Sequence, residues 1–244
     1  MLNVSGIENN SDKDLEWDEM QTDITVKNVT SAEWKQSSYF TLLKPILDYF
    51  IAAILLIITF PLFLIFAIGI KSHSPGPVFY YQKRIGKDGK PFRMIKFRSM
   101  RVNADTTLHK EYVQALIKQN TRPRDLGRET LKLEADPRIT GLGKVLRSFG
   151  LDELPQLINV LRGEMSIVGP RPSLEYELEV YEDWHKQRLS VLPGITGVWQ
   201  VTAHNSVPFN EMVQIDMDYI QNANLWLDLK VMLLTPIEML KKKG

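Results

Sequence analysis

The chain has 244 residues, 44% of them hydrophobic, so it is long enough to bury one substantial core and carry additional elements. Its formal net charge is only +1, which excludes a globally basic surface of the kind that binds nucleic acid, and we expect no nucleic-acid partner. The sequence has no cysteine, which excludes a disulfide framework, a thiolate metal site and a cysteine nucleophile.

Residues 1–38 combine many acidic side chains with few aliphatic ones. The acidic residues are Glu8, Asp12, Asp14, Glu16, Asp18, Glu19, Asp23 and Glu33. Such a segment cannot bury enough apolar surface to offset the entropy lost on ordering, so we predict a mobile acidic tail. It also lacks the basic and then apolar pattern of a signal peptide.

Residues 39–72 form the most apolar part of the chain. About 22 uncharged and mostly apolar residues run from Tyr49 to Ile70, which is enough to cross a hydrocarbon core. A buried helix of a soluble protein, apolar on every side, is the alternative. Length favours a membrane-inserted helix over residues 39–72.

Two features bear on how this helix enters the membrane. Pro61 interrupts the apolar run and should kink or break the helix there. The basic residues are Lys35 and Lys44 before the run, and Lys71, Lys83, Arg84, Lys87 and Lys90 after it. This asymmetry places the C-terminal part in the cytoplasm, and it is compatible with a single span and with a dip that returns. A re-entrant helix needs a break near its deep end, and Pro61 supplies one. We therefore predict the re-entrant form, with both ends cytoplasmic.

A β-hairpin is expected directly after the apolar run. Aromatic and β-branched residues between Val78 and Arg98 flank Asp88-Gly89, a strong hairpin turn signal. The hairpin is rich in lysine and arginine. These residues form either a basic collar for lipid headgroups or one wall of an anion site, and the two interpretations are compatible.

The remaining patterns predict mainly helices. We expect a helix and then a mobile loop within residues 101–134, a charged amphipathic helix over 175–189, and a turn and strand over 193–201. The last apolar stripe, residues 224–243, includes Trp226 and ends in lysines. It suits a helix lying at a membrane surface, and a core helix is the alternative.

Two adjacent carboxylates, Asp152 and Glu153, stand where one helix ends and the next begins. Leucines and an isoleucine recur at helical spacing up to Leu161, and Pro155 fits best in a first helical turn. The N–H groups at a helix start favour carboxylates and phosphates alike, and Arg147 lies just upstream. Taken alone, the stretch is more typical of a helix cap than of a catalytic site.

A second candidate anion-binding group is Arg171. It lies in Gly169-Pro170-Arg171-Pro172, where a proline on each side restricts the backbone and holds the arginine in place. A guanidinium arranged in advance suits bidentate contact with phosphate, although an ordinary surface turn has the same composition.

Together these blocks resemble the bacterial sugar transferases, the polyprenyl-phosphate hexose-1-phosphate transferases that act as monotopic phosphoglycosyl transferases. The resemblance extends from about Lys44 to the C-terminus and keeps the family's order. The matching blocks are Gln82–Gly86, Lys96–Met100, Asp136–Thr140, Arg147–Leu161, Gly169–Pro172 and Pro193–Gly197. The chain departs from the family after Val201, where Thr202-Ala203-His204-Asn205 replaces an arginine-containing run.

The resemblance implies a two-step mechanism. Asp152 is expected to be the nucleophile that attacks the sugar-proximal phosphate of a UDP-hexose, with Glu153 and Asp152 holding Mg²⁺. The covalent phosphosugar would then pass to undecaprenyl phosphate. The resemblance assigns phosphate binding to Arg147 and Arg171, and Lys96, Arg98 and Arg84 are further candidates.

The expected fold is therefore a membrane-anchored α+β protein. It combines a proline-broken re-entrant helix with a mainly helical cytoplasmic domain over residues 73–244, a small β-hairpin and interfacial amphipathic helices. The implied role is to initiate exopolysaccharide, capsule or other surface glycan assembly at the inner membrane, and a homo-oligomer is compatible with it. The alternative is a non-catalytic, membrane-bound paralogue that recruits other assembly factors.

Overall fold

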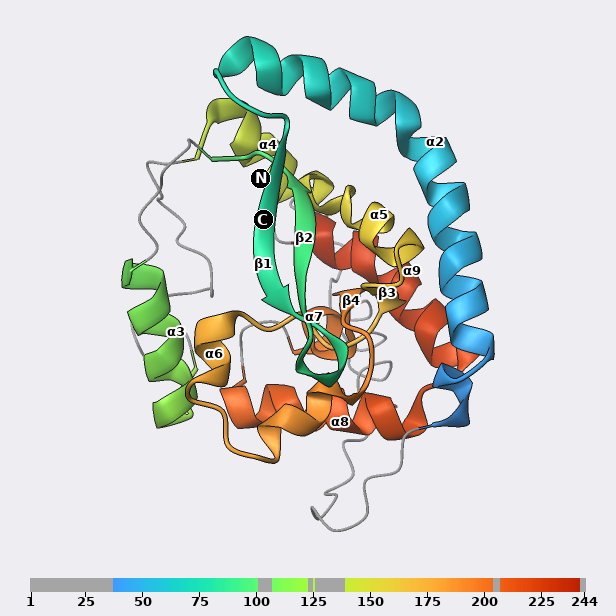
Figure 1. Cartoon of the computed structure of the whole chain (residues 1–244), viewed down its shortest axis with the longest axis vertical. Helices are drawn as coiled ribbons and strands as arrows, with labels where there is room; N and C mark the ends of the chain where they lie inside the picture. The colour runs from blue at the N-terminus through green and yellow to red at the C-terminus, as the bar shows by residue number, and fades with distance from the viewer. Residues whose placement is uncertain (1–36, 101–106, 123–124, 126–138, 204–206, 242–244) are drawn as a thin grey trace, which may run out of the picture.

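The chain is mostly helical and carries two small β-sheets (Figure 1). The computed structural model describes residues 37–100, 107–122, 125, 139–203 and 207–241. The tail predicted over residues 1–38, except for its last two residues, and the loop around Pro123 and Gly127 therefore lie outside it. The first elements are η1 (Ser38–Phe40), α2 (Leu43–His73), β1 (Phe79–Ile85), η2 (Lys87–Gly89), β2 (Pro91–Phe97), α3 (Thr107–Gln119), α4 (Gly141–Ser148) and η4 (Leu151–Glu153). Those that follow are α5 (Gln156–Leu161), β3 (Ser166–Val168), α6 (Glu175–Leu178), η5 (His185–Ser190), β4 (Gly194–Thr196), α7 (Val198–Thr202), α8 (Phe209–Asn222) and α9 (Leu225–Lys241).

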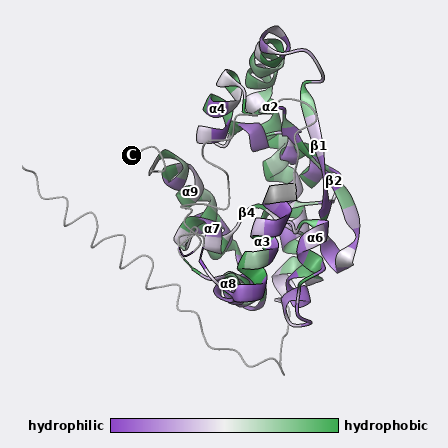
Figure 2. Ribbon diagram, turned by 90° about the vertical axis from the view of Figure 1, so that its left-hand side faces the viewer, coloured by the Kyte–Doolittle hydropathy of each residue, from purple (hydrophilic) through white to green (hydrophobic). Residues whose placement is uncertain are grey.

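Helix α2 is the long apolar helix predicted from the sequence. It is one continuous helix of 31 residues that passes through Pro61 and curves around one side of the molecule (Figure 1). Of the kink or break expected at Pro61, the helix shows no break: it stays continuous and is curved. Only 11% of its most apolar window is buried, and Figure 2 colours the helix mostly hydrophobic. By length and composition it is the one described helix able to cross a membrane.

The N-terminal end of α2 is fixed by buried polar side chains. Lys44 Nζ lies 2.6 Å from Asp228 Oδ2 of α9 and 3.5 Å from Asp48 Oδ1, one turn further along α2. Asp48 in turn accepts hydrogen bonds from the Ser166 hydroxyl and the Ile167 N–H of β3. A buried ion pair is tolerated only with such additional partners, so these contacts set where α2 meets the rest of the fold.

The C-terminal half of α2 packs on a second, separate apolar cluster. Phe63 and Ile70 of α2 are buried there with Phe97 of β2 and Leu146 of α4. The Phe63 and Phe97 rings meet edge to face with centroids 5.0 Å apart. Each half of α2 therefore contacts the same folded unit, the first half at the main core and the second half at this smaller cluster.

The predicted β-hairpin is confirmed. Strands β1 and β2 pair antiparallel from Phe79↔Phe97 to Ile85↔Pro91. The turn passes through Asp88 and Gly89, which both have positive φ, at 56° and 74°. Positive φ is the conformation for which an Asp-Gly pair is suited, so the turn residues determine the register of the two strands.

The main core surrounds a short parallel pair, β3 and β4. Ser166 pairs with Gly194, and a Cβ on Gly194 would lie 2.1 Å from the Gly169 nitrogen, so only glycine permits this approach. The prediction of a strand over residues 193–201 is right for β4 and wrong beyond it, because Val198–Thr202 form α7. The buried Val198, Trp199 and Val201 point into the core from a helical turn.

The helix predicted over residues 175–189 is not continuous. The segment forms the single turn α6 and the 3-10 helix η5, with a turn between them. Trp184 and His185 pack with ring centroids 4.1 Å apart, and His185 also meets Phe209 of α8. Packing of this aromatic group against α8 takes the place of the helical hydrogen bonds that the charge pattern suggested.

Candidate active site

The two adjacent carboxylates lie on the 3-10 turn η4. Gly150, with φ of 65°, ends the preceding helix in the left-handed conformation, and Leu151 and Leu154 pack on the smaller apolar cluster beside α2. Asp152 is only 5% exposed. The predicted α-helix starting at these carboxylates is shorter than expected, because α5 begins only at Gln156, with Pro155 before it. The turn therefore relies less on a helix dipole than the sequence suggested.

Glu153 is oriented by a lysine from the hairpin. Its Oε1 lies 2.9 Å from Lys96 Nζ of β2, and both side chains are about one-fifth exposed. The buried Asn159 of α5 accepts from Ile95 N–H and donates to the Arg93 carbonyl, which clamps α5 onto the edge of β2. This clamp fixes the distance between the carboxylate turn and the strand that carries Lys96.

Arg84 lies on the same face of the hairpin, beyond Lys96. It donates to the Pro172 carbonyl at 2.9 Å and to Gln82 Oε1. Burial, followed by the nearby Arg171, lowers the pKa of Arg84 from 12.5 to about 10, whereas Glu177 and Glu153 oppose that shift. Arg84 thus stays charged at neutral pH and lies between the carboxylate turn and Arg171.

The Arg171 loop is held from several sides. Arg171 Nη1 is 3.9 Å from Glu177 Oε1, and its side chain is 30% exposed. Arg188 of η5 donates to the Arg171 carbonyl at 3.4 Å and forms a buried ion pair with Asp216 of α8 at 2.5 Å. The two prolines and these backbone contacts leave the Arg171 guanidinium as the accessible part of the loop.

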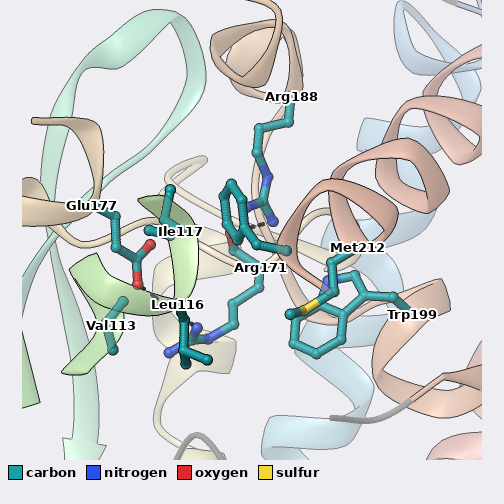
Figure 3. Close-up of a pocket in the computed structure, with 9 residues that line it drawn as sticks. Val113, Leu116, Ile117, Arg171, Glu177, Arg188, Trp199 and Met212 are labelled. Atoms are coloured by element: carbon teal, nitrogen blue, oxygen red, sulfur yellow. Dashed lines mark hydrogen bonds and ion pairs between the residues drawn. The ribbon is translucent and has the colours of Figure 1, made fainter. Parts of the chain in front are cut away.

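A cavity of about 30 Å³ opens at Arg171 (Figure 3). Helix α3 and helix α8 supply its apolar walls, and three charged side chains reach it. Its lining residues are Val113, Leu116, Ile117, Arg171, Glu177, Arg188, Trp199, Phe209 and Met212. The apolar walls with a few converging polar groups are typical of a small-molecule site.

The other predicted phosphate ligands occupy different positions. Arg147 is in the last turn of α4, half-buried, and in the described part of the chain its guanidinium has no hydrogen bond or ion pair. Arg98 is buried and donates to the Pro75 carbonyl and to Ser74, where it closes the C-terminal end of α2. The structure thus brings Glu153, Lys96, Arg84 and Arg171 to one side of the hairpin, with Asp152 beside Glu153 on η4, whereas Arg98 faces the end of α2.

Sequence reasoning missed the residues that support the site. Asn159, Glu177, Arg188 and Asp216 are all buried and all bonded to it or to its neighbours. For two of these residues the sequence does contain a signal. Asn159 and Asp216 are polar residues among the apolar side chains of α5 and α8, a pattern that indicates a buried hydrogen-bonded group.

Comparisons with known proteins identify the family of the chain. The chain is 44% identical over 188 residues to the exopolysaccharide production protein ExoY of Sinorhizobium fredii, which covers 77% of this chain and 81% of that protein. It is 39% identical to the UDP-glucose:undecaprenyl-phosphate glucose-1-phosphate transferase of Xanthomonas campestris, over 90% of this chain and 43% of that protein. It is also 39% identical to the undecaprenyl-phosphate galactose phosphotransferase of Salmonella typhimurium, over 86% of this chain and 42% of that protein. The family model for bacterial sugar transferases matches residues 39–242, and the chain belongs to that family.

Proposed function

We propose that the chain is a phosphoglycosyl transferase that moves a sugar 1-phosphate from a UDP-sugar to undecaprenyl phosphate. The reaction passes through a covalent phosphosugar on Asp152 and releases UMP. One observation carries the proposal: the buried Asp152 lies on a turn packed beside the apolar helix α2, with Glu153, Lys96 and the arginines on its other side. A phosphate site of this kind, next to a membrane helix, suits a reaction between a soluble donor and a lipid acceptor.

The chemistry proceeds in two displacements at one phosphorus. An Asp152 oxygen attacks the sugar-proximal phosphorus of the donor, a new P–O bond forms, and the P–O bond to UMP breaks with its electron pair leaving on UMP. A phosphate oxygen of undecaprenyl phosphate then attacks the same phosphorus. The bond to Asp152 breaks, which restores the carboxylate and gives a lipid diphosphate sugar.

The cationic side chains lower the repulsion between a carboxylate and an anionic phosphate. The Arg171 side chain is 30% exposed, and Arg147 and Lys96 flank the carboxylate turn from α4 and β2. Arg84 is buried, and its contact with the Pro172 carbonyl positions the Arg171 loop. Arg98 remains a candidate by sequence, although its hydrogen bonds hold the end of α2.

A Mg²⁺ ion is part of the proposal, held by Asp152 and Glu153. The residues that the structure describes contain no group of three or more metal-ligating side chains. Mg²⁺ in phosphoryl transfer is usually bound through one or two carboxylates together with the substrate phosphates, so the adjacent pair fits it. The ion would supply charge neutralisation on the phosphate oxygens, while Lys96 keeps Glu153 in place.

We further propose that α2 enters the cytoplasmic leaflet of the inner membrane and returns to the same side. A straight helix of its length is about 46 Å long at 1.5 Å per residue, and its two ends would lie beyond opposite faces of a bilayer. Both ends are instead tied to one folded unit, through Lys44 to Asp228 and through Arg98 to Ser74. The outward side chains of α2, such as Ile57, Ile58 and Ile68, are exposed and apolar.

The reaction is tested with purified full-length chain, Mg²⁺ and a panel of UDP-sugars, without lipid acceptor. We expect release of UMP and a phosphosugar mass adduct on the peptide that contains Asp152. No adduct and no UMP with any donor would overturn the assignment. Equal support of glycan synthesis in cells by the wild type and by Asp152→Asn would favour the non-catalytic, scaffold-like alternative.

The topology is tested by single cysteines in a chain that has none of its own. One cysteine replaces Ser38, which precedes α2, and another replaces Ser72 in the last turn of α2. Both should resist a membrane-impermeant thiol reagent in intact cells and react after the cells are opened. Labelling of the Ser38→Cys variant from outside would show that α2 spans the membrane.

A further inference from the structure

The cavity beside Arg171 contains buried donors that the fold does not use. The Trp199 indole Nε1 and the Arg188 Nε are both buried, and neither finds an acceptor within the described residues. Each parent residue is only 5% exposed. A buried donor without an acceptor costs free energy, and such groups in a native fold call for an explanation. A ligand oxygen in this cavity supplies one.

One acceptor faces the same space. The Oε2 atom of Glu177 already accepts from Leu174 N–H at 3.0 Å and from the Tyr181 hydroxyl at 3.3 Å. Its other oxygen, Oε1, lies 3.9 Å from Arg171 Nη1 at the cavity. Figure 3 shows Glu177 and Trp199 on opposite sides of the Arg171 guanidinium. The cavity therefore offers N–H donors together with one carboxylate acceptor.

The remaining walls are apolar. Leu116 and Ile117 of α3 and Met212 of α8 line the cavity (Figure 3). Phe209 of α8 is a further lining residue. A hexose carries a hydroxyl on almost every carbon, so most of its surface would lose hydrogen bonds against such walls. A flat heterocycle has two apolar faces and keeps its polar groups on one edge, which is the arrangement that these walls accept.

We propose that this cavity receives the uracil edge of the nucleotide-sugar donor. The uracil edge presents a carbonyl, an N–H and a second carbonyl. These groups match the Trp199 N–H, the Glu177 carboxylate and the Arg188 Nε–H, respectively. Cytosine presents an amino donor in place of one carbonyl, so the same groups disfavour it. The proposal rests on the proposed function, since it is a UDP-sugar that brings uracil to the site.

The position of Arg171 connects this subsite with the carboxylate turn. Arg171 lies at the cavity, and Arg84 experiences the charges of both Arg171 and Glu153. A cavity of about 30 Å³ holds only a few water-sized groups, which is enough for the polar edge of a ring. The ribose and the diphosphate then extend past Arg171 towards Asp152.

The first test measures binding of UMP and CMP to detergent-solubilised full-length chain by calorimetry. We expect UMP to bind at least tenfold more tightly than CMP. Trp199→Phe keeps an aromatic ring but removes the five-membered ring of the indole together with its N–H, so its Kd for UMP should rise about three- to tenfold. Trp184→Phe is the matched control, because its indole donates to Glu182 outside the cavity, and it should bind UMP as the wild type does. Equal UMP affinity in the two variants would overturn the proposal.

A second test reports the place of binding directly. 4-Thiouridine 5′-monophosphate, irradiated on the wild-type chain, should crosslink to the peptides of η5, α7 or α8, and excess UMP should suppress the product. A crosslink confined to other peptides would overturn the subsite. Glu177→Gln offers both a donor and an acceptor, so it should reduce the preference for UMP over CMP; an unchanged preference would contradict the role of Glu177.

These outcomes separate the subsite from the reaction. A phosphosugar adduct on Asp152 together with a crosslink elsewhere would leave the proposed function standing and refute the subsite. A crosslink in η5, α7 or α8 without an adduct from any UDP-sugar would support the subsite and refute the proposed function.

Discussion

The two ends of the candidate site are built in different ways. The carboxylate turn η4 is a single 3-10 turn packed on the smaller apolar cluster through Leu151 and Leu154, and Glu153 forms a partly exposed ion pair with Lys96. The Arg171 loop is instead supported by buried arginines, Arg84 and Arg188, which both donate to its backbone carbonyls. Arg188 is in turn paired with the buried Asp216.

The difference matches the two tasks that we propose. The proposed nucleophile has to exchange partners during the reaction, and the partly exposed ion pair of the neighbouring Glu153 can rearrange to permit this. The group that positions a diphosphate gains from being fixed in advance, because little order is lost when substrate binds. We therefore expect substitutions at the first end to act on the rate and those at the second end to act first on stability.

The largest effect should come from Asp152→Asn. Asparagine keeps the size of the side chain and removes the nucleophile, so UMP release should fall on the order of 10³-fold or more. The melting temperature should stay close to that of the wild type. Asp125→Asn is the matched control, since Asp125 is exposed and its ion-pair partner among the described residues is the nearby Arg122, and its rate should be unchanged. Substantial turnover by Asp152→Asn would show that Asp152 is not the nucleophile.

Arg188→Met should have the largest effect on folding. It leaves Asp216 buried without its ionic partner, which costs about 3–5 kcal/mol in comparable buried pairs. Thermal unfolding in detergent measures the loss. Adding Asp216→Leu should recover much of the stability, because it removes the unpaired charge. No recovery in the double variant would show that Arg188 supports the fold by some other contact.

Lys96→Met should lower the reaction rate strongly and the stability only slightly, whereas Arg188→Met lowers mainly the stability. The pair with Glu153 is about one-fifth exposed, so its loss should cost less than about 1 kcal/mol. The rate of adduct formation should fall roughly tenfold, because Glu153 loses its orientation and the phosphate loses a nearby cation. Single-turnover kinetics and thermal unfolding on the same sample measure both. A large drop in stability with an unchanged rate would reverse our assignment of the two ends.

The smallest effect concerns how the stability of the region around η5 depends on pH. His185 on η5 accepts from Glu182 N–H through Nδ1, and its Nε2 faces Asn210 Oδ1, so both nitrogens are satisfied in the neutral ring. Burial lowers its pKa below the ordinary 6.5. The folded state therefore binds fewer protons than the unfolded state below pH 6.5, and stability should fall as the pH drops. The melting temperature should decrease from pH 7.5 to 5.5 by more in the wild type than in His185→Gln.

Local patterns predicted the elements that depend on local physics. The Asp88-Gly89 turn, the helix α2 and the helix α9 all follow from turn chemistry or apolar periodicity within one segment. The membrane position of α9 stays a prediction, with Trp226 and Leu233 exposed along it. The predicted helix over residues 175–189 was wrong because contacts of Tyr181 and His185 with distant Phe209 decide that segment.

The candidate site was predictable only in part for the same reason. Asp152, Glu153, Arg147 and Arg171 stand in recognisable motifs, so their type and order were visible in the sequence. Their supports join residues far apart in the chain: Asn159 reaches β2, and Arg188 pairs with Asp216. No periodicity of a single segment contains such a pairing, which exists only once the chain has folded.

The buried contacts of α2 also bear on how the protein can be handled. Asp228 and Ser166 have their partners on α2, and Phe97 and Leu146 are covered by it. A chain that starts after His73 would leave a buried carboxylate without its lysine and would open an aromatic surface to water. The membrane helix is thus a structural wall of the catalytic unit, and solubilising this protein means replacing the lipid around α2 while keeping the helix itself.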